Sequence, residues 1–361
     1  MDQEFKRKNI LVTGGAGFIG CALSQKLANI SHRFLVVDNL VSQVHPSTKR
    51  PKELDQLAEL VIADIIEEST WANLFSNFRP DIIVHLAAET ATGQSLTEAS
   101  KHARTNVLGL TMLLDALIVH KVIPEHIILP SSRAVYGEGA WKTLDGEISY
   151  PGQRSNTQLA RAEWDFNGVP VLSSAGKTRE NPTSVYGATK LAQENLLRSW
   201  TFSFGVPLSI LRLQNVYGPG QSPFNPYTGI VILFSRLAMN KRTIELYEDG
   251  LITRDFVFID DVIDAITTAI NEVPKTGYRQ LDIGSGVTTT LLELAKMITD
   301  LHSAPPAVIC GKYRNGDIRH ASCDITAALQ ELSWAPKWTL VKGINLLQKY
   351  LTENNLEELE I

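Results

Sequence analysis

Long apolar runs are missing from this sequence. None of its segments reaches the ~18 consecutive apolar residues that a membrane-spanning helix needs. The first residues, Met1 to Lys8, are largely charged or polar and lead directly into an apolar segment, without the apolar stretch of a signal peptide. We therefore expect a cytoplasmic protein that has no membrane partner.

Cysteine and one-sided charge are scarce as well. The three cysteines, Cys21, Cys310 and Cys323, lie far apart in no metal-ligand spacing, which is typical of reduced, buried thiols and predicts no metal site. Acidic and basic residues are interspersed and give a net charge of −5, so no basic face is predicted that could bind nucleic acid. A charged ligand would have to be bound by local groups.

A glycine-rich turn stands between the first apolar segment and an amphipathic one. Its residues, T-G-G-A-G-F-I-G at 13–20, indicate a strand, a tight turn and a helix. Gly14 lets the chain leave the strand, and Gly17 lets the backbone approach a pyrophosphate at the helix N-terminus. The next apolar run ends in Asp38, as in dinucleotide sites. A loop without a ligand could contain the same glycines, but the strand, the helix and Asp38 together favour a dinucleotide site.

Strand and helix patterns alternate through the first half of the 361 residues. This alternation predicts an α/β protein with a Rossmann-type, doubly wound parallel sheet and a smaller α/β substrate-binding domain. The alternation ends near residue 214, and a strand at 256–259 followed by a helix suggests a return to the sheet. We expect a cofactor domain over 1–214, with 254–283 returning to it, and a substrate domain over 215–253 and 284–361.

Other strand ends carry candidate ligand contacts. Asp64 follows a predicted strand and could hold an adenine or cap the next helix, and both interpretations stay open. Ala87 and Ala88 follow another strand and would let the backbone lie against a cofactor ribose. A predicted helix at 95–117 contains Asn106, for which core packing is the simpler interpretation.

Polar residues also follow the strand that begins at His126. The segment 131–137, S-S-R-A-V-Y-G, includes Ser132 and Arg133 and is predicted at the carboxyl edge of the sheet, where open α/β folds bind ligands. A long connection then runs over 138–183. Loops of this length are commonly lids or binding loops, although a disordered insertion is almost as good an interpretation.

Tyr186 and Lys190 open the next predicted helix and share one of its faces. A lysine beside a phenol favours the phenolate, so we expect Lys190 to lower the pKa of Tyr186 toward the range of a general base. This spacing alone is common on helix surfaces. Behind a glycine turn and a serine-bearing strand end, the catalytic interpretation is preferred.

Two arginines in the second half of the sequence, Arg254 and Arg314, are either solvated or form a clamp for a diphosphate.

Together these segments resemble the extended short-chain dehydrogenase/reductases of the NAD-dependent epimerase/dehydratase family, over nearly the whole chain. The motifs appear in family order: T-G-G-A-G-F-I-G at 13–20, H-L-A-A at 85–88, S-S-R-A-V-Y-G at 131–137, Y-x-x-x-K at 186–190, N-V-Y-G-P-G at 215–220 and R-D-F-V-F at 254–258. Within the group, segments such as 87–95, 214–222 and N-P-Y-T-G-I at 225–230 look most like dTDP-L-rhamnose 4-epimerases.

The resemblance implies NAD as cofactor, a dTDP- or UDP-linked hexose as substrate, and a homodimer paired through the helices at 106–120 and 186–204. The implied catalytic residues are Ser132, Tyr186 and Lys190. The predicted cofactor-binding residues are Gly14, Gly17, Phe18, Ile19, Asp38, Asn39, Asp64, Ile65, Leu86, Ala87, Ala88, Asn106, Tyr186 and Lys190. The predicted substrate-binding residues are Thr90, Ser132, Arg133, Asn215, Arg254 and Arg314.

The sequence fits other activities of the group less well than 4-epimerisation. Dehydratases and decarboxylases carry acidic residues after the strand-end Ser or Thr, and here those positions are Arg133 and Ala134. A net reductase usually takes its hydride from NADPH, whose 2′-phosphate Asp38 would repel. A UDP-glucose 4-epimerase remains an alternative. A non-enzymatic NAD-binding protein is disfavoured because Ser132, Tyr186 and Lys190 are all present.

Overall fold

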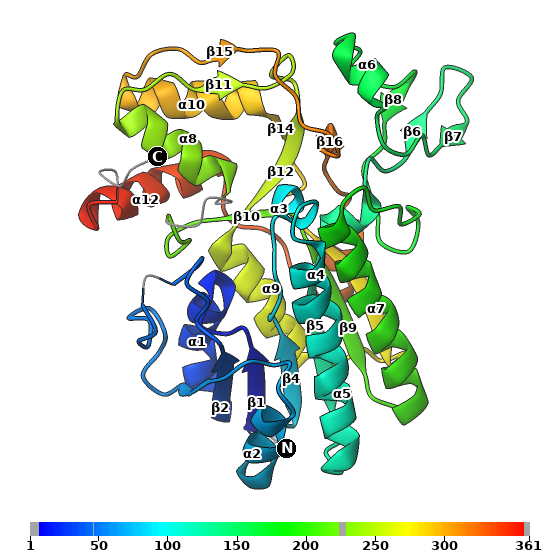
Figure 1. The fold of residues 1–361 in the computed structure, drawn as a ribbon, viewed down its shortest axis with the longest axis vertical. Helices are drawn as coiled ribbons and strands as arrows, with labels where there is room; N and C mark the ends of the chain where they lie inside the picture. The colour runs from blue at the N-terminus through cyan, green and yellow to red at the C-terminus, as the bar shows by residue number, and fades with distance from the viewer. Residues whose placement is uncertain (1–6, 46, 224–228, 357–361) are drawn as a thin grey trace.

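The computed structural model describes residues 7–45, 47–223 and 229–356, and a seven-stranded sheet forms its centre (Figure 1). The strands run parallel in the order β13-β9-β5-β4-β1-β2-β3, which confirms the predicted Rossmann-type fold. Their bounds are β1 Lys8–Thr13, β2 Ser31–Asp38, β3 Glu59–Ile62, β4 Ile82–His85, β5 His126–Ser132, β9 Leu208–Leu213 and β13 Tyr278–Ile283. Most of the 225–230 motif, residues 225–228, lies outside the described residues.

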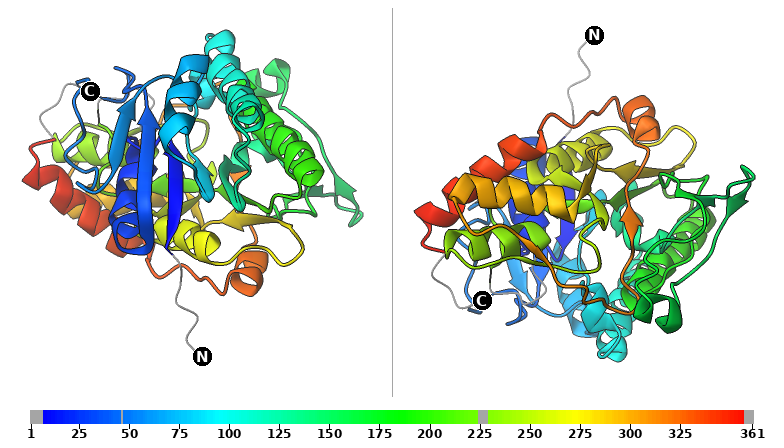
Figure 2. Two further views of the ribbon diagram at one scale, coloured as in Figure 1. Left: turned by 90° about the horizontal axis from the view of Figure 1, so that it is seen from below. Right: turned by 90° about the horizontal axis from the view of Figure 1, so that it is seen from above.

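Helices cover both faces of this sheet, because each strand buries side chains in both directions. In β1, Ile10 and Val12 join one hydrophobic core, whereas Leu11 joins the other. One side of the molecule carries three helices in each view: α4 Ala99–Ala103, α5 Gly109–Val119 and α7 Val185–Phe204 (Figure 2). The first core is built with α1 Phe18–Ile30 and α9 Ile259–Asn271, and the second with α2 Glu68–Asn77, α5 Gly109–Val119 and α7 Val185–Phe204.

The predicted helix at 95–117 is present with shifted bounds and contains a π turn. From residue 92 to 119 the chain is helical except at 96–98. It forms α3 Thr92–Ser95, α4 Ala99–Ala103, a π-helical turn at Arg104–Leu108 and α5. Asn106 lies in the π turn and is fully buried. Its amide bonds the backbone of Glu89 in both directions and donates to Thr189 Oγ1 at 2.9 Å. A single π turn inside an α-helix is a π-bulge, and here it carries the buried Asn106.

A second, smaller sheet holds the strand that was expected to return to the central one. Strand β12 pairs with three others, and only β13 joins the central sheet, so that expectation is wrong for 256–259. Buried Asp255 in β12 accepts hydrogen bonds from the backbone of Ser285 and Gly286, which anchors β12 to the loop after β13. The strands are β10 Asn215–Tyr217, β12 Thr253–Phe258, β14 Thr288–Thr290 and β16 His320–Ala321.

The remaining helices of the second half pack on the same core as α1 and α9. This continuous core joins the central sheet to the smaller one. The helices are α8 Ile230–Met239, α10 Leu291–His302, α11 Thr326–Glu331 and α12 Leu340–Glu353, and a small parallel pair is formed by β11 Glu245–Leu246 and β15 Val308–Ile309.

The long connection at 138–183 has structure of its own. It contains a three-stranded antiparallel sheet and a short helix: β6 Trp141–Lys142, β7 Ile148–Ser149, β8 Val169–Pro170 and α6 Asn156–Ala160. Trp141 is buried and packs edge-on against Phe166 and against His320 of β16. The insertion is therefore attached to the second sheet (Figure 1).

Across the described residues, no helix has both the length and the apolarity that a membrane crossing requires. The three cysteines are free; Cys21 and Cys323 are buried and Cys310 is partly exposed.

Candidate active site

The glycine turn has the geometry that its sequence predicts. Gly14 has a φ of +67°, and a Cβ added there would lie 2.6 Å from the Ala87 backbone. Only glycine therefore lets the turn lie against the end of β4. Gly17 occupies the N-cap of α1, which has no side-chain cap, and an added Cβ there would meet only Gly14 O at 3.4 Å. The helix N-terminus is thus left to an outside anion.

A cavity of about 640 Å³ opens at this turn, within the usual range of small-molecule sites. It is lined by most of the predicted cofactor residues, together with Thr90: Gly14, Gly17, Phe18, Ile19, Asp38, Asn39, Asp64, Ile65, Leu86, Ala87 and Ala88. Lining residues that the sequence did not single out include His45, Lys49, Arg50, Thr105 and Tyr350. They come from a loop, the π turn and the distant C-terminal helix, so no local motif marks them.

Asp38 ends β2 at the edge of the cavity. Its carboxylate accepts from the backbone N–H of Ala16 at 3.0 Å and of Leu40 at 2.9 Å, which fixes its orientation. Asn39 donates to Asp64 at 3.2 Å, and Asp64 also accepts from Ile66 N at 3.1 Å. Asp64 thus forms a turn and lines the cavity. The interpretation of Asp64 as a helix cap is wrong, because the N-cap of α2 is Glu67, and the contact of Asp64 with the adenine stays a prediction.

Ser132 and Tyr186 meet at the carboxyl edge of the sheet. Ser132 ends β5, accepts from Ala134 N at 3.1 Å and hydrogen-bonds Tyr186, which lies in the first turn of α7. Burial raises the pKa of Tyr186, while the bond with Ser132 lowers it, and the net direction is upward. The expected lowering of this pKa by Lys190 is therefore wrong for the protein alone.

Lys190 is directed into the protein. Its ammonium donates to Pro130 O at 3.0 Å and to Gln193 Oε1 at 2.6 Å, and its side chain is only 3% exposed. Burial lowers the pKa of Lys190 to about 8, against the opposing charge of Glu194. The ammonium is thus costly to keep charged and is held by two acceptors.

Two predicted substrate arginines lie near each other. Burial and the charge of Arg254 lower the pKa of Arg133 to about 10. Arg254 lies on β12, and its guanidinium reaches Asp317 at 3.1 Å and Ile318 O at 2.8 Å. Asn215 lies on the adjacent strand β10, in register with Phe256. Adjacent guanidinium groups repel each other, so this region favours an anionic ligand.

Neither Arg314 nor Asn106 is among the residues that line the cavity. Arg314 is exposed and lies 4.9 Å from the ring centre of Tyr247, in a cation–π contact. Asn106 uses both amide protons within the protein and braces the end of β4 against α7. Among the described residues, no cluster of three or more His, Cys, Asp or Glu side chains could hold a metal ion.

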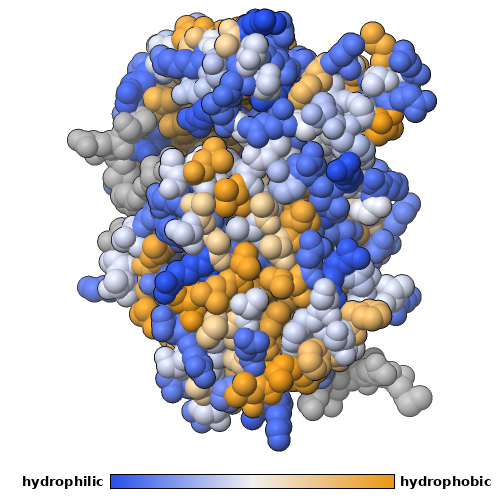
Figure 3. All heavy atoms as spheres, turned by 45° about the vertical axis from the view of Figure 1, so that its right-hand side comes forward, coloured by the Kyte–Doolittle hydropathy of each residue, from blue (hydrophilic) through white to orange (hydrophobic). Residues whose placement is uncertain are grey.

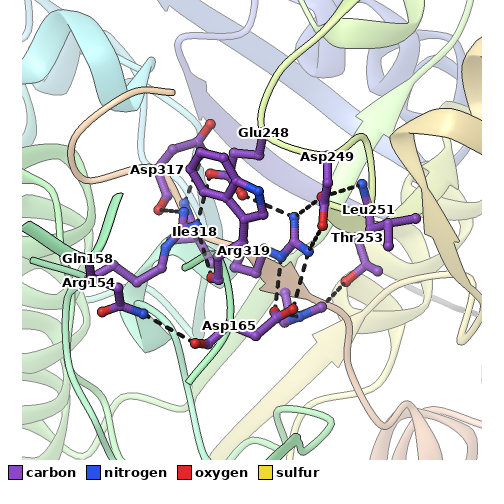
Figure 4. A network of polar contacts seen from close by, with 12 residues as sticks. Arg154, Gln158, Asp165, Glu248, Asp249, Leu251, Thr253, Asp317, Ile318 and Arg319 are labelled. Atoms are coloured by element: carbon purple, nitrogen blue, oxygen red, sulfur yellow. Dashed lines mark hydrogen bonds and ion pairs between the residues drawn. The ribbon is translucent and has the colours of Figure 1, made fainter. Parts of the chain in front are cut away.

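A buried ionic network that the sequence did not reveal lies beside the insertion (Figure 4). Arg319, 1% exposed, donates to Asp249 at 2.6 and 2.8 Å, to Asp165 at 3.0 Å and to Glu248 at 3.0 Å. Arg154 of the insertion pairs with Glu138 at 3.2 Å and Glu248 at 2.9 Å, and it donates to Asp317 O at 2.9 Å. Because Asp317 also pairs with Arg254, the network connects the insertion to the arginine site.

Comparison with known proteins places this site in a family. Residues 10–284 match the model of the "NAD dependent epimerase/dehydratase family". The chain belongs to this family. It is 56% identical to a dTDP-L-rhamnose 4-epimerase of Burkholderia thailandensis, over 96% of this chain and 95% of that protein.

Two solved structures of family relatives have the same fold. A UDP-glucose 4-epimerase of Thermotoga maritima with UDP-glucose is 29% identical, covers 96% of this chain and 99% of its own, and has a TM-score of 0.76. MoeE5 in complex with UDP-glucuronic acid and NAD is 25% identical with a TM-score of 0.74, and the match covers 96% of this chain and 99% of that one. The predicted cofactor, NAD, is thereby supported.

Proposed function

We propose that this protein is an NAD-dependent nucleotide-sugar 4-epimerase that interconverts dTDP-L-rhamnose and dTDP-6-deoxy-L-talose. One observation carries the proposal. Ser132 at the end of β5 meets Tyr186 of α7, and Lys190 of the same helix bonds Pro130 O of β5. These residues lie at the same edge of the sheet as the glycine turn. The 56% identical relative supports this substrate. No acidic side chain directly follows Ser132, since Arg133 and Ala134 occupy those positions, and this disfavours a dehydratase.

The cavity fits NAD. Its pyrophosphate would meet the uncapped N-terminus of α1, and Asp38 would accept hydrogen bonds from the adenosine ribose hydroxyls. Asp64 and Ile65 would lie at the adenine, and Lys190 at the nicotinamide ribose. The chemistry that NAD supplies when bound is the acceptance and return of one hydride.

Tyr186 acts as the general base and then as the general acid. It takes the proton from the C4 hydroxyl of the sugar as C4 loses hydride, and it returns that proton when the hydride comes back on the opposite face. Ser132 hydrogen-bonds the same oxygen throughout. Burial opposes the phenolate, and the positive charge of the oxidised cofactor would favour it. No atom is gained or lost over the cycle.

Asn215, Arg254 and Arg314 hold the diphosphate while the 4-keto sugar turns between its two faces. Arg133, beside Arg254, completes the anion site, and Thr90 borders the sugar. In this proposal residues 1–214 carry the cofactor, with β13 returning to their sheet, and the segments around β10, β12 and residues 284–361 carry the substrate. The insertion at 138–183 closes over the sugar, since both of its ends adjoin the site.

The protein as purified should carry NAD rather than NADP. The Asp38 carboxylate is held by Ala16 N and Leu40 N and would repel a 2′-phosphate while accepting from two ribose hydroxyls. Denaturing the protein and identifying the released nucleotide by chromatography tests this. A supernatant that contained mostly NADP would contradict it.

A panel of sugar nucleotides tests the substrate. With dTDP-L-rhamnose we expect conversion to the C4 epimer, and with UDP-glucose a kcat/KM lower by at least about tenfold, a loss of roughly 1.4 kcal/mol of transition-state binding. Products are identified by NMR. If UDP-glucose were the better substrate, the family assignment would stand and the dTDP-L-rhamnose assignment would fall.

We further propose a cytoplasmic homodimer paired through α5 and α7. Figure 3 views the side that carries these helices, and apolar side chains gather over its lower half. The exposed apolar residues of these two helices include Ile118, Val119, Phe202 and Phe204; Phe202 is 91% exposed. Such a patch is typical of a protein interface.

Light scattering should therefore give a dimer mass at micromolar concentration, and Phe202→Glu should give a monomer. Leu144→Glu is the matched control, because Leu144 is 84% exposed but lies in the insertion. A wild-type monomer mass, or equal effects of the two substitutions, would rule out this interface.

A further inference from the structure

A buried chain of hydrogen-bonded side chains runs from Lys190 to the start of the glycine turn. Lys190 Nζ lies 2.6 Å from Gln193 Oε1, Gln193 Nε2 lies 3.2 Å from His85 Nε2, and His85 Nδ1 lies 2.8 Å from Thr13 Oγ1. All four side chains are at most 3% exposed. Thr13 directly precedes the glycine turn, and its Oγ1 accepts from Ala87 N at 3.3 Å. The chain thus joins the catalytic lysine to the cofactor cavity's wall.

The charge on Lys190 fixes the direction of every bond in this chain. An ammonium can only donate, so the Gln193 atom facing it is the oxygen and the atom facing His85 is the amide nitrogen. The amide donates, so His85 Nε2 must accept and the ring proton must lie on Nδ1, from which it is donated to Thr13 Oγ1. If His85 were doubly protonated, its Nε2–H and the Gln193 amide N–H would face each other as two donors 3.2 Å apart.

The surroundings keep His85 neutral. Burial, with the charge of Lys190 second, lowers the pKa of His85 to about 3. Among other titratable groups, the charge of Glu194 on the next turn of α7 acts on Lys190. Tyr186 lies one turn before Lys190 in the same helix. Neutral His85 and Gln193 therefore act as a fixed pair that presents an amide oxygen to the ammonium.

We propose that Gln193 is a positioning residue for Lys190, with His85 fixing the orientation of its amide. Pro130 O and Gln193 Oε1 accept two of the three ammonium protons, so the position of the Lys190 ammonium depends on both acceptors. Without Gln193, the buried ammonium would keep a single protein acceptor. This inference rests on the proposed function, because it assumes that charged Lys190 supports catalysis.

The test compares two substitutions at Gln193 with a matched control. Gln193→Leu removes the acceptor, so the charged form of Lys190 is disfavoured, and Gln193→Glu supplies a carboxylate acceptor that favours it. Gln348→Leu is the control: Gln348 is also buried between a histidine and a hydroxyl, 2.9 Å from His302 Nε2 and 2.7 Å from Ser235 Oγ, but it lies in α12.

The measurements are kcat and KM as functions of pH, and the titration of Lys190 Cε by NMR in NAD-loaded protein with carbon-13 lysine, assigned by its loss in Lys190→Met. We expect Gln193→Leu to lower kcat about tenfold or more at neutral pH with KM within about twofold. In Gln193→Leu, the Lys190 titration and the loss of kcat at alkaline pH should both move to lower pH. In Gln193→Glu, both should move to higher pH.

The proposal would be overturned if both Gln193 variants kept the wild-type Lys190 titration and the wild-type pH dependence of kcat, as is expected of Gln348→Leu. If Gln193→Leu does not fold, Gln193→Glu alone decides by the direction of its shift. The NMR titration also separates this inference from the proposed function. A wild-type protein that epimerises no sugar nucleotide refutes the function, whereas the Lys190 shifts still report whether Gln193 holds the ammonium.

Discussion

Replacing Tyr186 by Phe should lower the rate of C4 epimerisation by at least about 10²–10⁴-fold, the usual contribution of a positioned general base. The substitution removes the phenolic oxygen that hydrogen-bonds Ser132 and leaves the ring in place. The NAD cavity, lined by other residues, should stay loaded. The rate is measured by product formation from dTDP-L-rhamnose, and cofactor content by nucleotide release.

Tyr278→Phe provides the control for this experiment. Tyr278 is the first residue of β13, at the opposite end of the parallel strands, and it packs against Arg198. Losing its hydroxyl should leave turnover unchanged. Near-normal epimerisation by Tyr186→Phe would require a different base.

Replacing Arg319 by Met should lower the free energy of unfolding by about 3–5 kcal/mol, the usual cost of removing one partner from a buried ion pair. Arg319 is 1% exposed, and the substitution would leave Glu248 buried with one cation fewer and Asp249 without its two-pronged guanidinium contact. The change is measured by denaturant unfolding, with the slope compared to show that the unfolding reaction is unchanged.

Arg33→Met is the matched surface control. Arg33 pairs with Glu59 at 2.7 Å, but both side chains are over 40% exposed, so the cost should be only about 0–1 kcal/mol. Equal losses in the two variants would contradict the structural role of the network. If Arg319→Met fails to fold, Asp165→Asn, which removes the carboxylate charge that faces Arg319 and His320, should still lose more stability than Arg33→Met.

The parts of the site that sequence could predict are those in which local motif and parallel topology coincide. The glycine turn, Asp38 and Ser132 all follow strands of one parallel sheet, and such strand ends share an edge. Tyr186 and Lys190 keep a helical spacing at the start of α7, so their common face was predictable.

The parts that could not be predicted depend on contacts between distant segments. The Arg319 network joins residues 154, 165, 248 and 319, whose spacing carries no local pattern. Strand β12 was placed in the wrong sheet because alternation predicts an element and not its partner. Asn106, in the π turn, bonds Thr189, which lies 83 residues away in the sequence.

The pKa values at the site show the same limit. The Tyr186 and Lys190 spacing predicts a lowered pKa for the phenol, but burial opposes it and directs the pKa upward. The positive charge that favours the phenolate must then come largely from the bound cofactor. The residue pattern therefore predicts which groups act but not the balance of their energies.

The most direct test of the account uses dTDP-L-rhamnose that carries deuterium at C4. The hydride that leaves C4 is returned from within the same active site, so the dTDP-6-deoxy-L-talose formed in ordinary water should keep its deuterium at C4, as read by NMR and mass spectrometry. Loss of the deuterium to solvent, or a product with C4 unchanged, would contradict 4-epimerisation by hydride return.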